Sequence, residues 1–107
     1  MKRPNKYGAV KTRFGDEVFD SRRECNRWME LRTLQRAGLI SDLERQVTYD
    51  LTVNGVRVAR IKPDFRYQRD GQTVVEDVKS KPTMTPVFRL KAKLLEVLHG
   101  VKLELVL

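Results

Sequence analysis

Three charged residues in the second half of the chain have the types and the spacing that a hydrolytic site needs. Asp77 and Lys79 are two residues apart in a stretch with the alternation of a β-strand, so both side chains project from one face of that strand. Asp64 begins the preceding strand, directly after Pro63, and an antiparallel ladder can bring it across to that pair. The sequence therefore predicts two carboxylates and an ammonium group in one place.

Two carboxylates and a lysine suit the hydrolysis of a phosphodiester. Carboxylates on neighbouring strands can hold a hard cation, Mg²⁺ or Mn²⁺, while water and a phosphate oxygen occupy its other positions. Such a cation lowers the pKa of its bound water and neutralises charge in the transition state. A lysine beside it can position or deprotonate the attacking water, or stabilise charge on the phosphate. The alternative is a cross-strand cluster of ion pairs, which contributes little stability on a surface.

A predicted β-hairpin carries these residues. Its strands at 64–68 and 73–79 are rich in aromatic and β-branched residues, and Asp70-Gly71 between them is a favoured two-residue turn. Glu76 points to the opposite face by the alternation of the strand, so we leave it out of the site. A β-bulge would reverse that choice.

A further carboxylate, Glu24, lies on the predicted first helix. Ser21 is the N-cap and Glu24 the third helical position, which together make a capping box, and the helix runs to Ala37. On a helical wheel, Glu24 falls on the same face as Trp28 and Leu31, so its carboxylate faces the core and needs a partner. We favour a role for Glu24 in the site, which capping does not exclude.

The remaining elements follow from periodicity and turn chemistry. We expect a small hairpin at 12–19, a long strand at 43–53, its partner at 56–61 after the turn Asn54-Gly55, a helix from Thr85 to His99, and a closing strand at 101–107. The predicted order is a hairpin followed by αβββαβ. Gln46 in the long strand could reach the site or DNA, or could be an ordinary exposed polar residue, because periodicity does not decide its face.

Length and composition restrict the class of protein. A chain of 107 residues forms one domain, and a net charge of +8 with a pI near 10 favours nucleic acid as a partner over a membrane, since no lipidation signal is evident. Cys25 is the sole cysteine and His99 the sole histidine, which excludes an internal disulfide, a Cys-based zinc site and a Ser-His-Asp triad. No apolar run could span a membrane, and the first residues lack the apolar core of a signal peptide, so we expect a cytoplasmic protein.

Residues 1–12 are predicted to form a flexible basic arm ahead of a single domain at 13–107. The arm is basic, contains Pro4 and Gly8, and has no apolar periodicity. It could lie along a phosphate backbone or simply keep the chain soluble. The candidate phosphate contacts are Lys6 and Lys11 in the arm and Arg66, Lys81 and Arg89 in the domain.

Together these motifs resemble those of the PD-(D/E)XK nuclease superfamily. The matching residues are Pro63-Asp64, then Asp77-Val78-Lys79, with Glu24 on the preceding helix, and the order of elements agrees from Asp20 onward. The resemblance implies an α/β fold with a restriction-endonuclease-like αβββαβ core. In that fold two helices flank a central mixed sheet, and this chain adds an N-terminal hairpin.

The resemblance also implies an activity, that of an Mg²⁺-dependent endonuclease hydrolysing DNA. Asp64 and Asp77 would ligate the metal, Lys79 would handle the attacking water or the transition-state charge, and Glu24 would bind a second metal or orient water. The chain is most similar to small phage-type nucleases, including Holliday junction resolvases of the phage endonuclease I type and TnsA-type endonucleases. Branched DNA is therefore a candidate substrate, and two symmetric cuts would need a homodimer.

Other functions stay open at this point. One is a non-catalytic DNA-binding or phage-assembly module on a nuclease fold, although the intact set of four site residues argues against it. Another is a ribonuclease or RNA-binding domain, which the absence of aromatic or Gly-rich RNA-binding signatures disfavours. The sequence leaves cleavage specificity undecided, because base readout depends on a few loop side chains.

Overall fold

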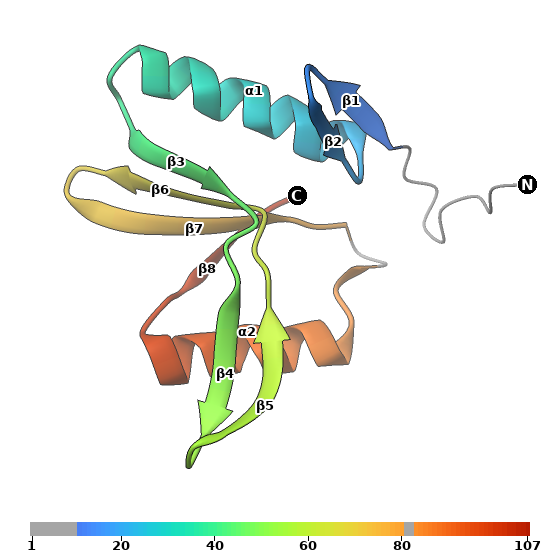
Figure 1. Ribbon diagram of the computed structural model, residues 1–107, viewed down its shortest axis with the longest axis vertical. Helices are drawn as coiled ribbons and strands as arrows, with labels where there is room; N and C mark the ends of the chain where they lie inside the picture. The colour runs from blue at the N-terminus through green and yellow to red at the C-terminus, as the bar shows by residue number, and fades with distance from the viewer. Residues whose placement is uncertain (1–10, 81–82) are drawn as a thin grey trace, which may run out of the picture.

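A mixed sheet of four strands, in the order β3-β6-β7-β8, lies at the centre of the fold (Figure 1). The computed structural model describes residues 11–80 and 83–107. The strands are β3 (Ser41–Arg45), β6 (Phe65–Arg69), β7 (Gln72–Val78) and β8 (Leu103–Val106). The first three pair antiparallel, and β8 pairs parallel to β7. The α/β class, the mixed sheet and the two helices agree with the prediction.

The predicted hairpin is confirmed in β6 and β7. Their register runs without interruption from the pair Phe65 and Glu76 to the pair Arg69 and Gln72. Asp70 and Gly71 have φ values of 52° and 75°, the positive values that a tight two-residue turn requires. The pairing of β7 with β8 is also continuous from Val75 to Val78, which keeps Asp77 and Glu76 on opposite faces of β7.

Helix α1 (Arg22–Arg36) covers one face of the sheet and begins and ends as predicted. Ser21 is its N-cap, and the Ser21 Oγ accepts a hydrogen bond from the Glu24 N–H (3.1 Å). Leu31, fully buried, packs with Phe65 and Tyr67 of β6 in the core cluster under the helix. The expected small hairpin, β1 (Thr12–Phe14) and β2 (Glu17–Phe19), lies beside α1. The hairpin begins at Thr12, as predicted.

The long strand expected at 43–53 was wrong, because the structure divides it into two strands in different sheets. Its first part is β3, and its second is β4 (Tyr49–Val53), which pairs with β5 (Val56–Ile61) in a separate ribbon. The chain turns at Gln46, whose φ is +53°. Alternation continued across this point and no glycine marked it, so periodicity alone joined the two parts. Within the described ranges, five strands therefore separate the helices, whereas the predicted ranges give four and the predicted order αβββαβ gives three.

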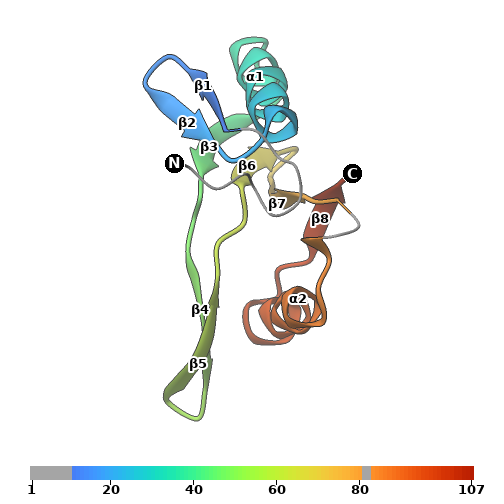
Figure 2. The ribbon, with the colours of Figure 1, turned by 90° about the vertical axis from the view of Figure 1, so that its right-hand side faces the viewer.

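The ribbon and helix α2 (Pro86–His99) form the second layer of the molecule, on the other side of the sheet from α1 (Figures 1 and 2). Thr85 caps α2 by accepting a hydrogen bond from the Phe88 N–H (3.1 Å), as predicted from Thr85-Pro86. Leu95 of α2 packs against Leu51 and Ile61 of the ribbon. The helix thus contacts the ribbon more than the sheet. Neither α1 nor α2 has the length and apolarity needed to cross a membrane, and the described residues contain no other helix that does.

Candidate active site

Asp64 and Asp77 lie side by side where β6 begins and β7 ends. Asp64 directly precedes β6, and Asp77 is the second-last residue of β7. The backbone N–H of Asp64 donates to Asp77 Oδ1 (3.1 Å), and the N–H of Val78 donates to Asp64 Oδ2 (2.8 Å). Asp77 is only 5% exposed. Backbone hydrogen bonds therefore hold the two carboxylates together at the edge of the core.

Lys79 joins this pair, as its spacing from Asp77 predicts. Its Nζ is 3.3 Å from Asp77 Oδ2 and 4.1 Å from the centre of the Phe88 ring on α2. The backbone of Lys79 is also held, because its carbonyl accepts a hydrogen bond from Arg23 Nη1 (3.3 Å) on α1. The ammonium group consequently sits between a carboxylate and an aromatic face, which hold it in place.

The carboxylate pair carries more negative charge than its surroundings balance. Burial raises the pKa of Asp64 to about 9, with further contributions from a hydrogen bond to Asp77 and from the charges of Asp77 and Glu24. A negative charge beside a buried carboxylate disfavours the ionisation of that carboxylate. At neutral pH Asp64 therefore holds a proton, and a bound cation could take the place of that proton.

Glu24 is buried on the core face of α1, as the helical wheel predicts, but its partners differ from those expected. Its Oε2 accepts from the backbone N–H of Asp20 (3.3 Å), and its Oε1 lies 3.5 Å from Arg45 Nη2. Burial and the charge of Asp20 raise the pKa of Glu24, and Arg45 opposes that shift. Although its charge reaches Asp64, Glu24 makes no cluster with the pair. The described part of the chain contains no group of three or more His, Cys, Asp or Glu side chains that could hold a metal ion.

Arg45 is the residue near the site that sequence reasoning missed. Its Nη1 lies 3.1 Å from Glu17 Oε2, and its guanidinium lies 3.9 Å from the centre of the Phe19 ring. Together with its contact to Glu24, these interactions hold a half-buried cation between β2, β3 and α1. No motif in the sequence marks Arg45. The only feature that distinguishes Arg45 is its position directly before Gln46, where the chain turns between β3 and β4.

The structure shows whether the side chains of Gln46 and Glu76 reach the site, which the sequence left undecided. The backbone N–H of Gln46 donates to the Asp64 carbonyl (2.9 Å), while the Gln46 side chain is exposed. Glu76, 1% exposed, lies on the face of β7 opposite Asp77 and binds Arg27 Nε (2.6 Å) and the Tyr67 hydroxyl (2.8 Å). Glu76 thus ties α1 to the sheet rather than joining the site.

The three predicted phosphate contacts that the structure describes come from separate parts of the chain. Arg66 is half-buried and donates to Glu44 Oε2 (2.7 Å) and to the Tyr49 hydroxyl (3.2 Å), so its charge is already paired. Lys11 lies 3.8 Å from Asp20, and Arg89 is exposed on α2. Lys6 and Lys81 lie outside the described residues, as does most of the predicted arm.

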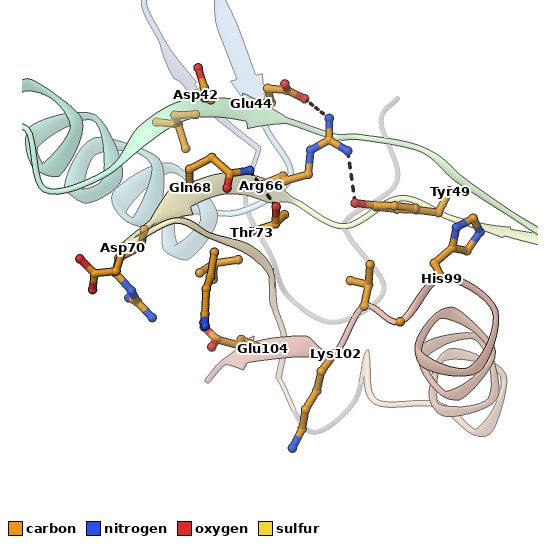
Figure 3. A pocket seen from close by; sticks show the side chains of 16 residues that line it. Asp42, Glu44, Tyr49, Arg66, Gln68, Asp70, Thr73, His99, Lys102 and Glu104 are labelled. Atoms are coloured by element: carbon orange, nitrogen blue, oxygen red, sulfur yellow. Dashed lines mark hydrogen bonds and ion pairs between the residues drawn. The ribbon is translucent and has the colours of Figure 1, made fainter.

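The cavity that Arg66 lines is separate from the carboxylate pair. It has a volume of about 1020 Å³ and opens between the sheet and the end of α2, where Figure 3 shows Arg66 pointing between Glu44 and Tyr49. Its lining contains both cationic and anionic residues, and Asp64, Asp77 and Lys79 are not among them. The cavity therefore lies beside the candidate site and is not part of it.

Comparison with known protein families identifies the family of the chain. A family model described as "Protein of unknown function (DUF1064)" matches residues 4–106. The chain belongs to the DUF1064 family. The matched range of this DUF1064 protein includes Glu24, Asp64, Asp77 and Lys79. Searches of curated proteins and of solved structures found no match, so the likeness to nucleases rests on the chain's own residues.

Proposed function

We propose that this DUF1064 protein is a metal-dependent endonuclease that hydrolyses phosphodiester bonds in DNA. The observation that carries the proposal is the cluster of Asp64, Asp77 and Lys79. Its two carboxylates are joined across β6 and β7, and its ammonium group lies 3.3 Å from Asp77. The net charge of +8 supports a polyanionic substrate.

The order of the sheet elements supports the same proposal. The β4–β5 ribbon forms a sheet of its own, and without it the chain runs α1, β3, β6, β7, α2, β8. That is the αβββαβ order of a restriction-endonuclease-like core. In this order Asp64 directly precedes the second strand and Asp77 lies on the third, which agrees with the resemblance to PD-(D/E)XK nucleases.

Asp64 and Asp77 are the residues that would hold Mg²⁺ or Mn²⁺. The fit follows from their electrostatics, since burial and their mutual repulsion raise the pKa of Asp64 and a divalent cation would relieve that repulsion. Mg²⁺ commonly binds through one or two carboxylates and keeps several waters, so a pair is a sufficient set of protein ligands. When bound, such an ion supplies an acidified water and a counter-charge for the phosphate.

Side chains of the protein would then have separate roles in hydrolysis. Hydrolysis forms a bond from a water oxygen to phosphorus and breaks the bond to the leaving oxygen, which takes up a proton. Lys79 Nζ, held by Asp77 and Phe88, is placed to orient that water or to stabilise charge on the phosphate. Before this step, Asp64 must give up the proton that it holds at neutral pH. Glu24, buried against Arg45, would orient water or assist a second metal.

A cleavage assay with three DNA structures tests the proposal. A four-way junction, a linear duplex and a single strand would each be incubated with Mg²⁺, Mn²⁺ or EDTA, using the wild type, Asp77→Asn and Lys79→Ala. We expect metal-dependent cutting that both variants lose while they still bind DNA. Preference for the junction would identify branched DNA as the substrate and call for a homodimer. Equal cutting by wild type and Asp77→Asn would contradict the assignment.

A non-catalytic DNA-binding module is the second candidate, and one observation favours it. In the described residues Glu24 pairs with Arg45, and no three potential ligands gather around one point. A module of this kind would bind DNA and leave it intact with every metal. The same assay therefore separates the two candidates.

A further inference from the structure

The ribbon of β4 and β5 extends away from the central sheet, past α2, as Figures 1 and 2 show from two directions. Its inner face is anchored, because Leu51 and Ile61 pack against Leu95. Its outer end is the turn Asn54-Gly55, with φ values of 49° and 80°. A tight turn leaves this end of the ribbon narrow.

The base of the ribbon adjoins the candidate site. On one side Gln46 donates its backbone N–H to the Asp64 carbonyl (2.9 Å). On the other side only Lys62 and the buried Pro63 separate β5 from Asp64. The tip of the ribbon is therefore held at a fixed distance and direction from the carboxylate pair.

The exposed end of the ribbon carries side chains that can read base edges. Arg57 lies across the ladder from Thr52, and Asn54 occupies the turn. Arginine and asparagine make paired hydrogen bonds to guanine and adenine in the major groove. Val56 is 62% exposed and Val58 is 56% exposed, and their methyl groups could contact those of thymine.

The positive charge of the ribbon also favours DNA as its partner. Residues 49–62 contain three basic residues and one acidic residue, for a net charge of +2. The acidic residue, Asp50, is already paired with Arg60 (2.9 Å). In the described part of the chain Arg57 has no carboxylate partner, so its charge is available to a ligand.

The dimensions of the ribbon match those of duplex DNA. Strands of five and six residues, at about 3.3 Å per residue, give an arm roughly 17 to 20 Å long. That length corresponds to about five or six base pairs at a rise of about 3.4 Å. The major groove, about 12 Å wide, admits a two-stranded ribbon.

We propose that the β4–β5 ribbon enters the major groove of duplex DNA and contacts base edges five or six base pairs from the phosphate that Asp64 and Asp77 act on. This inference rests on the proposed function, because it places DNA at that pair. It requires that the substrate contain duplex DNA beside the cut, and it makes contacts of the ribbon tip a determinant of where the enzyme cleaves.

The test combines two ribbon variants with duplexes of two lengths. Arg57→Ala removes the free charge, and Asn54→Gly removes a base-reading amide while keeping a residue that tolerates positive φ. Arg36→Ala is the matched control, because it removes an exposed arginine from the end of α1. One duplex extends at least fifteen base pairs beyond the cut on each side, and the other only three.

On the long duplex we expect kcat/KM to fall about tenfold in Arg57→Ala and severalfold in Asn54→Gly, with less than a twofold change in Arg36→Ala. On the short duplex the wild type should fall to the level of Arg57→Ala, and that variant should fall no further. Equal melting temperatures would show that all variants are folded.

Two results would overturn the inference and leave the nuclease intact. One is equal cutting of both duplexes by the wild type, and the other is an Arg57→Ala variant that behaves like Arg36→Ala. Absence of cutting in every condition would instead count against the proposed function. In that case the affinity of the same variants for the long duplex tests the ribbon contact. A loss of affinity in Arg57→Ala and Asn54→Gly, but not in Arg36→Ala, would support that contact.

Discussion

The backbone N–H of Asp64 donates to Asp77 Oδ1 at 3.1 Å, and the N–H next to Asp77 on β7, that of Val78, donates to the Asp64 carboxylate at 2.8 Å. Each carboxylate is thus fixed by the strand of the other. Holding two acids together in a buried place is electrostatically unfavourable, and it raises the pKa of Asp64 to about 9. Strongly shifted pKa values with a specific charge partner are typical of functional sites.

The raised pKa predicts how the stability of the metal-free protein depends on pH. The folded state binds the Asp64 proton more tightly than the unfolded chain, in which the pKa is about 4. The stabilisation is therefore complete below pH 4 and is lost as the pH rises toward about 9. We expect the Tm in EDTA to fall between pH 5 and pH 9, with a flatter profile in Asp64→Asn. Superimposable profiles for the two proteins would contradict this assignment.

Metal binding should reverse that loss of stability. A ligand that binds only the folded state, present at ten times its Kd, stabilises it by about 1.4 kcal/mol, which corresponds to a Tm increase of several degrees. We expect Mn²⁺ or Mg²⁺ to raise the Tm of the wild type near pH 8, and Asp77→Asn to abolish the increase. Glu96→Gln, which neutralises an exposed carboxylate on α2, is the control and should keep it. An equal increase in all three proteins would indicate non-specific binding.

The pairing of Glu24 with Arg45 predicts a separation of activity from stability. Glu24→Gln keeps the shape of the side chain and an oxygen for the Asp20 N–H, while Arg45 retains Glu17 at 3.1 Å. We therefore expect a loss of about 1 kcal/mol or less in the free energy of unfolding. Cleavage should fall at least tenfold if the charge of Glu24 takes part in the site.

Glu17→Gln provides the comparison for that experiment. It removes the other carboxylate partner of Arg45, and its own side chain is 43% exposed and lies on β2. We expect it to leave the cleavage rate within twofold of the wild type. If both variants slowed cleavage equally, Glu24 would act only through the position of Arg45.

The hairpin that carries the site could be predicted because its signals are local. The turn Asp70-Gly71 and the strand-forming residues around it specify β6 and β7 within fifteen residues. The alternation of side chains then fixed which of Glu76 and Asp77 shares a face with Lys79. For the same reason the caps of both helices could be located from Ser21 and Thr85.

The contacts that sequence reasoning missed are long-range. Gln46 adopts a positive φ without being glycine, and its N–H is held by the Asp64 carbonyl, eighteen positions further along the chain. Arg45 reaches Glu24 across 21 positions. Neither contact leaves a local pattern, because tertiary packing decides both. The separate β4–β5 ribbon follows directly from the first of them.

Phe88 gives the last prediction, which concerns how Lys79 is held. The Lys79 Nζ lies 4.1 Å from the centre of the Phe88 ring, and a cation–π contact of this kind is worth about 0.5 to 2 kcal/mol. Phe88→Leu should therefore slow single-turnover cleavage by about two- to tenfold at saturating metal, because the ammonium group loses one of its two supports. Phe88→Tyr keeps the aromatic face and should restore most of the rate at a similar Tm. If leucine and tyrosine gave the same rate, Phe88 would serve only the packing of α2, and Asp77 alone would position the lysine.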